Sequence, residues 1–393
     1  MTRGKKLLLI FSVTLAFTGA AVFYLARNYI RHTPGKPQPV PTSGDLTLDA
    51  IRRGLAFLQA HQEEDGHFVA GLVAPKASFT ALVIEAAVNS PDRLRPRNHP
   101  WLARAVQALL AEQKPDGGIY TKIPGMSFGN YSTSLAVMAL SSLQDPAYKP
   151  AIDRACAYLR KNQRIGGNDD PLRGGMDYGG SGKPDLNNTM TMLEALRAAG
   201  VPADDPAYKA AVEFVQNTQN RSESNPQPWA GDDGGFIYRP AESPAGSSVD
   251  SQGRVRYASY GTMSYAGLVS FLYAHVDKND PRVRSAFQWV QKHYDLHENV
   301  GMKDVGLYYY YRIMAKALAA YGEPIITTPD GAQHRWAEEL AENLLRLQQP
   351  DGSWVNDNTA YLEGDPILVT AYAVRALSIC YEEMQKYSPS PSP

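Results

Sequence analysis

A carboxyl group and two amides stand at the start of an apolar segment, in the run PDLNNT from Pro184 to Thr189. The carboxyl of Asp185 can act as a general acid or base. The amides of Asn187 and Asn188 exchange hydrogen bonds but cannot deliver an acidic proton. Because Asp and Asn are also favoured at helix starts, the run equally predicts a helix beginning here. With Asp304 and Asp365, Asp185 forms our weak set of candidate catalytic acids and bases.

Aromatic side chains gather where the weakly charged segments begin, and they suit the lining of a concave site. Because neighbours on a helix point in different directions, at most two of the tyrosines at 308–311 can face one ligand. The alternative is that most of these rings only pack between helices. The candidate cavity residues are Phe79, Tyr131, Asp185, Asn187, Asn188, Trp229, Tyr260, Tyr308, Tyr309 and Tyr361.

Metal and cofactor chemistry is not expected. Cys156 and Cys380 lie in apolar helical patterns and are interpreted as buried thiols. His293 and His297 are four residues apart, a spacing that can bind a metal on one helix face, but they end an outer helix on its expected solvent side. The formal net charge of -1 offers no electrostatic case for nucleic acid as a partner.

The elements that position these residues form a repeat of an amphipathic helix, a Gly-rich loop and a nearly uncharged helix, recurring about every 55 residues. The loops at 62–68, 113–120 and 348–354 share a Gln four residues before a Gly, an Asp before that Gly and an aromatic residue after it. Asp-Pro pairs at 145–146, 205–206 and 280–281 mark the joins between repeats. The segment 220–256 interrupts the spacing, which is typical of a lid, a binding loop or disorder.

One-sided apolar stripes, such as Ile51, Leu55 and Leu58, indicate outer helices, whereas the uncharged helices are expected to be buried all round. Six such pairs predict an all-α, (α/α)6 toroid. Alignment of the inner helices places Thr80, Thr133, Thr189, Tyr311 and Thr370 at one position, with Thr262 as the sixth.

A layer of charge follows from this alignment, five residues beyond the shared position. It comprises Glu85, Met138, Glu194, Gly267, Lys316 and Arg375. Because the last inner helix neighbours the first in a closed ring, Arg375 is expected to pair with Glu85.

The run from Gln349 to Trp354 (QPDGSW) resembles the QW motif of squalene and oxidosqualene cyclases, which share the α/α-toroid superfamily with protein prenyltransferase β subunits. The resemblance covers about residues 46 to 383 and implies the prenyltransferase and squalene oxidase repeat fold. Class II cyclases carry Pro-Asp-Xaa-Asp-Asp-Thr, whose middle Asp protonates an alkene or epoxide. Here Asn187 and Asn188 replace the last two carboxyls, so the resemblance does not extend to this activity. The zinc ligands of prenyltransferases and a diphosphate-binding Asp-Asp-Xaa-Xaa-Asp run are also absent.

The amino terminus has the pattern of a membrane anchor. Basic residues precede an uncharged stretch from Leu7 to Ala26, about 20 residues, enough to cross a bilayer as a helix. A cleaved signal peptide is the alternative. The predicted organisation is a cytoplasmic tip and anchor at 1–32, a Pro-rich linker at 33–44, the toroid at 45–385 and a disordered tail at 386–393. A slight basic excess before the stretch places the toroid outside the cytoplasm.

Three functions remain open at this point. The first is a toroid that binds an isoprenoid or other apolar ligand in a central cavity. The second is a non-catalytic scaffold or partner-binding module tethered to the membrane, which predicts a filled centre. The third is a carbohydrate-active enzyme that uses paired carboxylates across a polar cleft.

Overall fold

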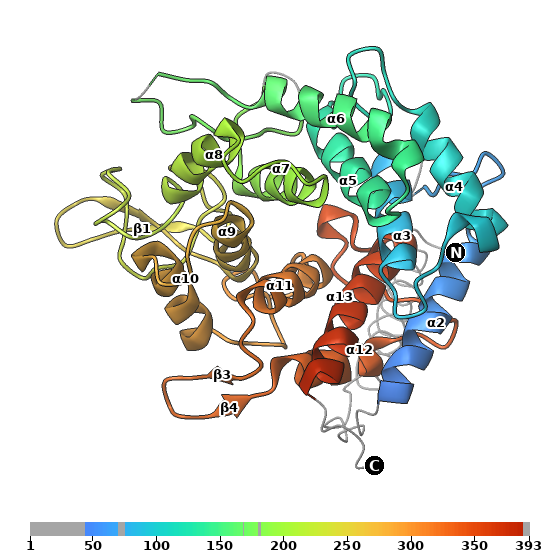
Figure 1. Ribbon diagram of the computed structural model, residues 1–393. Helices are drawn as coiled ribbons and strands as arrows, with labels where there is room; N and C mark the ends of the chain where they lie inside the picture. The colour runs from blue at the N-terminus through green and yellow to red at the C-terminus, as the bar shows by residue number, and fades with distance from the viewer. Residues whose placement is uncertain (1–43, 70–74, 168, 180–181, 388–393) are drawn as a thin grey trace, which may run out of the picture. The chain divides into compact units, whose positions relative to one another are not determined.

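The computed structural model describes residues 44–69, 75–167, 169–179 and 182–387, and most of these residues are helical (Figure 1). The expected anchor at 1–32 and nearly all of the linker lie outside the described residues, as does most of the expected tail. Within the described part of the chain, no helix has the length and apolar character needed to span a membrane. Among the described residues, the helices run from one that begins at Gly44 to one that ends at Tyr387.

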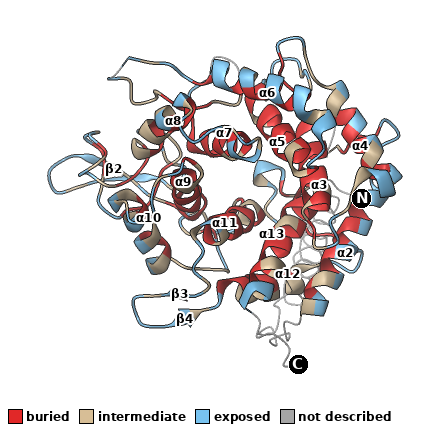
Figure 2. Cartoon of the chain, viewed as in Figure 1, coloured by how far each residue is buried: buried red, intermediate tan, exposed pale blue. Residues whose placement is uncertain are grey.

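Two sets of helices alternate along the chain. The outer set is α2 (Gly44–Ala60), α4 (Pro100–Ala111), α6 (Lys149–Asn162), α8 (Pro206–Gln216), α10 (Pro281–Lys292) and α12 (Trp336–Leu347). The inner set is α3 (Lys76–Val88), α5 (Gly129–Ser142), α7 (Leu186–Ala198), α9 (Gly261–Tyr273), α11 (Leu307–Tyr321) and α13 (Pro366–Tyr387). Outer helices bury one face, whereas inner helices such as α3 and α5 are buried along nearly their whole length (Figure 2).

The inner helices form a closed ring in the described residues. Each contacts the next in chain order, from α3 through α5, α7, α9 and α11 to α13, and α13 returns to contact α3 (Figure 1). This arrangement confirms the expected toroid. A linear array would leave its first and last inner helices apart.

A glutamine clamp fastens neighbouring repeats. In the first repeat, Gln62 Nε2 donates to the carbonyl of Gly66 at 3.0 Å and to that of Trp101, in the next outer helix, at 2.8 Å. The same pair of hydrogen bonds is made by the side chains of Gln113, Gln163 and Gln219. The last clamp, from Gln348 to Gly352 and to Ala50 of α2, joins the end of the ring to its beginning.

The clamp requires a glycine at its turn. Gly352 has φ +91°, a left-handed conformation, and a Cβ there would lie 2.7 Å from the carbonyl oxygen of Arg53. The predicted joins also hold, since the side chains of Asp145, Asp205 and Asp280 each cap a helix whose first residue is Pro.

In five repeats the shared inner-helix position accepts a hydrogen bond from the loop before it, whereas Tyr311 in the remaining repeat donates to the carbonyl of Leu296. Thr370 Oγ1 accepts from the backbone N–H of Trp354 at 3.0 Å, and Thr80, Thr133 and Thr189 do the same for their own loops. In the fourth repeat the acceptor is Ser264, bonded to the N–H of Phe236 at 3.1 Å. The assignment of Thr262 to this position was therefore wrong by two residues, and Gly267 with it.

Two short hairpins complete the described elements. Strands β1 (Ser247–Val249) and β2 (Val255–Tyr257) pair antiparallel inside the 220–256 insertion. Strands β3 (Ile326–Thr327) and β4 (Gln333–His334) pair antiparallel between α11 and α12.

Candidate functional site

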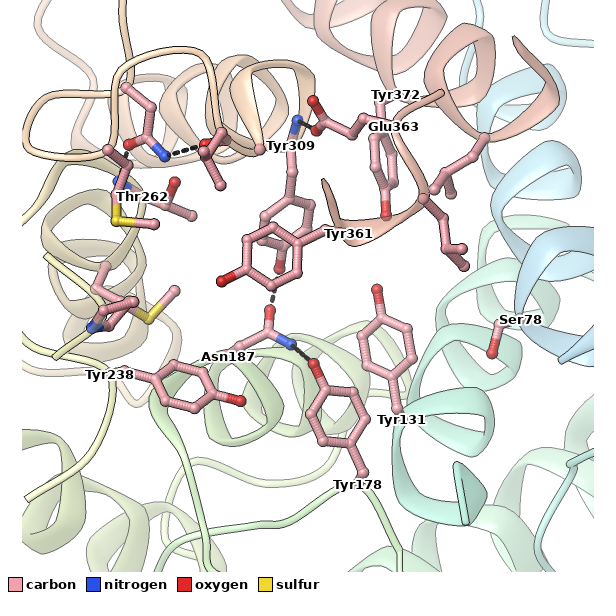
Figure 3. A pocket seen from close by; sticks show the side chains of 18 of the residues that line it. Ser78, Tyr131, Tyr178, Asn187, Tyr238, Thr262, Tyr309, Tyr361, Glu363 and Tyr372 are labelled. Atoms are coloured by element: carbon pink, nitrogen blue, oxygen red, sulfur yellow. Dashed lines mark hydrogen bonds between the residues drawn. The ribbon is translucent and has the colours of Figure 1, made fainter. Parts of the chain in front are cut away.

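A cavity of about 490 Å³ opens at the end of the ring where the inner helices begin. Its volume lies within the range of small-molecule sites, roughly 300–1,000 Å³. Most of its wall is aromatic or aliphatic (Figure 3). The aromatic lining residues are Phe79, Phe128, Tyr131, Tyr178, Tyr238, Tyr260, Tyr309, Tyr361 and Tyr372.

The cavity gathers most of the residues singled out in the sequence. Phe79, Tyr131, Asn187, Tyr260, Tyr309 and Tyr361 line it. The remaining candidates, Asp185, Asn188, Trp229 and Tyr308, are not among its lining residues. Trp229 instead packs edge-on against Tyr257 inside the insertion.

Residues that the sequence did not single out complete the wall. Tyr178 and Tyr238 come from the loops before α7 and α9, and Tyr372 comes from the second turn of α13. The insertion also contributes its segment from Glu242 to Pro244, so part of it borders the cavity.

Asp185 lies behind the cavity wall as the N-cap of α7. Its carboxylate accepts from the backbone N–H of Asn188 at 2.9 Å and from Asn188 Nδ2 at 2.8 Å, with Arg239 4.0 Å away. Burial raises the pKa of Asp185 to about 6, against these hydrogen bonds and the charge of Arg239. Asp185 and Asn188 therefore shape the start of α7, and from behind the wall Asp185 also holds the lining residue Tyr238 by a hydrogen bond.

Asn187, one residue into the same helix, does reach the cavity and holds two tyrosines. Its Oδ1 accepts a hydrogen bond from the hydroxyl of Tyr309, and its Nδ2 donates to the hydroxyl of Tyr178 at 3.3 Å (Figure 3). The position that matches the proton-donating Asp of the class II motif is therefore a hydrogen-bonded amide.

Glu363 is the buried carboxylate of the lining, with no exposed surface. It accepts from the backbone N–H groups of Tyr308 and Tyr309 at 3.2 and 2.7 Å and from Asn356 Nδ2 at 2.8 Å. Burial raises its pKa, and these hydrogen bonds oppose the shift. Its negative charge also suits the amino end of α11, so the geometry assigns it a helix-capping role.

The rim of the cavity carries a strained turn. Tyr361 and Leu362 have φ values of 56° and 66°, a region that non-glycine residues seldom adopt. Both side chains are more than half exposed, although both border the cavity. In Figure 3 the ring of Tyr361 lies across the opening, close to Asn187 and Tyr309.

Below the cavity, a layer of buried charged side chains links inner helices of the ring. Glu85 accepts from Arg312 at 2.8 Å, from Lys316 at 2.9 Å and from Arg375 at 3.4 Å, and Lys316 also donates to Glu194 at 2.7 Å. The Arg375 to Glu85 contact confirms the sequence prediction. Arg312, which completes the layer, was not anticipated.

The layer lies directly under the aromatic floor. Arg312 and Arg375 each stand three residues beyond the lining residues Tyr309 and Tyr372 on their helices, about one turn deeper. The guanidinium of Arg312 is centred 5.5 Å from the ring of Tyr372.

The other acidic candidates do not face one another across the cavity. Asp365 caps the start of α13, accepting from the N–H groups of Ile367 and Leu368, and burial raises its pKa. Asp304 accepts a hydrogen bond from Asn358 Nδ2 at 3.1 Å. Neither is a lining residue. Helix α10 ends at Lys292, so His293 and His297 do not share a helix face as the sequence suggested.

Comparison with known proteins identifies the fold. No family model and no curated protein matches the sequence. Among solved structures, the type II terpene cyclase MstE from Scytonema superposes with a TM-score of 0.54 at 14% identity, covering 87% of this chain and 100% of the other. An unsaturated glucuronyl hydrolase specific for heparin gives 0.56 at 14% identity, covering 88% and 99%.

A family 76 glycoside hydrolase from a bovine Bacteroides thetaiotaomicron strain gives a TM-score of 0.55 at 10% identity, covering 86% of this chain and 77% of the other. At these identities the likeness establishes the α/α toroid and no narrower family. The squalene-cyclase resemblance and its QW motif therefore stand on the sequence pattern alone. In the structure, Gln348 bonds the carbonyls of Ala50 and Gly352.

Proposed function

We propose that the toroid binds an isoprenoid or another apolar ligand in its cavity, without protonation-initiated cyclisation. The observation that carries this proposal is the cavity itself, walled by aromatic rings at one end of the ring and floored by the charged layer. A non-catalytic scaffold would be expected to fill this space with side chains. The open aromatic wall favours a ligand-binding role instead.

The acid groups near the cavity do not favour cyclisation. In the sequence resemblance Asn187 matches the proton donor of the class II motif, and an amide has no proton of the required acidity. Asp185 lies behind the wall, and Glu363 is engaged by two backbone amides and Asn356. A ligand can therefore be held here without a group suited to protonating an alkene.

A carbohydrate ligand is the second candidate. Two of the compared toroids are carbohydrate-active enzymes, and aromatic faces also stack on sugars. Hydrolysis by the usual route needs two carboxyl groups about 5–10 Å apart and facing the bond. The carboxyls in the described lining are Glu242, at the exposed edge, and the helix-capping Glu363. This arrangement favours binding of an apolar ligand over sugar hydrolysis.

The cellular location of the protein is proposed as well. We propose that the uncharged stretch at 7–26 anchors the chain in a membrane with the toroid outside the cytoplasm, where an apolar ligand is available from the bilayer.

Mass spectrometry of lipids extracted from the purified full-length protein tests the proposed function. We expect an isoprenoid or other lipid to be retained by the wild type and lost from Leu82→Trp, which fills the cavity from α3. Thermal melting checks that the variant is folded. Equal recovery from both proteins, or a retained saccharide, would contradict the proposal.

A further inference from the structure

One side of the cavity carries a row of hydrogen-bonded polar side chains. Tyr309, Asn187 and Tyr178 form a hydrogen-bonded row, which we call the polar wall, and Tyr238 lies beside it (Figure 3). The other side of the cavity carries hydrocarbon, including Phe79 and Leu82 from α3. An occupant that matches both sides is apolar for most of its length and polar at one end.

The direction of the hydrogen bonds shows what the polar wall offers. The hydroxyl of Tyr309 donates to Asn187 Oδ1, and Asn187 Nδ2 donates to the oxygen of Tyr178. A phenol has a single donor hydrogen, and that of Tyr178 is not used in accepting this bond. In the structure Tyr178 is hydrogen-bonded with the phenol of Tyr238, and an oxygen of a bound ligand can take the place of that phenol. The polar wall is therefore suited to a hydrogen-bond acceptor.

The charges around the cavity limit what kind of acceptor fits. Among the described lining residues none is Lys, Arg or His, and the two ionisable carboxyls are Glu242 and Glu363. Two cations stand next to the lining and both have carboxylate partners: Arg312 bonds Glu85 at 2.8 Å, and Arg239 lies 4.0 and 3.7 Å from Asp185 and Glu242. A diphosphate or carboxylate would lose its hydration here and would have to compete with these carboxylates for a cationic partner.

We propose that the polar end of the ligand is a neutral oxygen function, a hydroxyl or carbonyl, recognised by the polar wall, and that anionic isoprenoids are excluded. This inference rests on the proposed function and narrows its ligand class. Asn187 is then a specificity residue, because it orients Tyr178 as a donor. The same position would hold the catalytic carboxyl if the chain were a class II cyclase.

Four probes that share one tail test the inference on the full-length protein in detergent. They are farnesene, farnesol, farnesyl diphosphate and farnesylamine, titrated by tyrosine and tryptophan fluorescence. We expect farnesol to bind most tightly. One net hydrogen bond is worth about 0.5–1.5 kcal/mol, so its advantage over farnesene is roughly two- to twelve-fold. The diphosphate should bind more weakly than the hydrocarbon.

Two variants assign this preference to the polar wall. Tyr178→Phe removes the donor and should bring farnesol to the affinity of farnesene while leaving farnesene unchanged. The matched control is Tyr308→Phe, which removes a buried phenol outside the lining and should keep the wild-type preference. Thermal melting confirms that both variants fold.

The outcomes separate the two proposals. If none of the probes binds, the proposed function fails and this inference fails with it. If the diphosphate or the amine binds most tightly, the cavity still holds an isoprenoid but the neutral-oxygen inference is wrong. Equal affinities for farnesol and farnesene, or a preference that survives in Tyr178→Phe, would also overturn it.

Discussion

Replacing Glu85 by Gln removes the negative charge on which three cations converge. Glu85 is 4% exposed and bonds Arg312, Lys316 and Arg375. In Glu85→Gln, Lys316 keeps its bond to Glu194, whereas Arg312 and Arg375 lose their carboxylate partner. Loss of one partner from a buried ion pair costs about 3–5 kcal/mol, because the remaining charges stay desolvated. We expect a comparable loss of unfolding free energy and a melting temperature lower by roughly 5–10 °C.

The pH dependence follows from the pKa of Glu85. Burial alone would raise it, but the charges of Lys316, Arg312 and Arg375 hold it well below its usual range. A carboxyl with a lowered folded-state pKa stabilises the protein above its unfolded pKa, about 4.3, and loses that contribution as the pH falls further. Urea denaturation at pH 7 and pH 3 should therefore show a smaller gap between wild type and variant at pH 3.

A second substitution tests whether charge is the cause. Arg312→Met in the Glu85→Gln background removes a cation that has lost its carboxylate partner, and it should restore about 1–2 kcal/mol of unfolding free energy. The surface control is Asp153→Asn, whose exposed pair with Lys149 is worth about 0.5 kcal/mol or less. If Arg312→Met lowers stability further, the loss comes from packing and the electrostatic argument is wrong.

Three further changes test other parts of the structure. Gly352→Ala should lower the free energy of unfolding, measured by urea denaturation, by about 2–3 kcal/mol. The control Gly253→Ala, at a glycine that also has positive φ but open space around it, should lower it by about 1 kcal/mol. Equal losses would contradict the clamp argument. Because the pKa of Asp185 is raised, its contribution to stability is lost as the pH rises through about 6. The free energy of unfolding of Asp185→Asn should therefore increase relative to that of the wild type by about 2–3 kcal/mol between pH 4 and pH 7. Parallel pH curves would refute this. Tyr361→Gly relieves a strained φ, so it should keep the melting temperature and weaken farnesol binding; unchanged binding would exclude Tyr361 from the ligand contact.

The ring could be predicted from the sequence because its signals are local. The contact between Arg375 and Glu85 followed once the alignment was combined with closure, although 290 residues separate the pair. Arg312 was missed because it lies one turn before the aligned layer, and side-chain length brings it to Glu85. The clamps of Gln163 and Gln219 were missed because 11 and 15 residues separate them from their glycines, instead of four.

The cavity could be predicted only in part. Residues at inner-helix starts were found because helix geometry places them at the mouth, as with Phe79 and Tyr309. Tyr178 and Tyr238 lie in loops, where no periodicity indicates direction. Of the two tyrosines predicted from the run at 308–311, Tyr309 lines the cavity and Tyr308 does not. In the fourth repeat Ser264 was missed because a serine stands where the pattern predicted a threonine.

The clamp from Gln348 to Ala50 affects how the protein comes apart. A linear solenoid frays from its terminal repeats, each of which has one neighbour. Here the first and last repeats are held to each other, so no unit can leave without breaking two interfaces at once. Hydrogen exchange of the inner-helix amides should accordingly show one cooperative opening for the whole ring, and a cut in a surface loop should leave the two fragments associated.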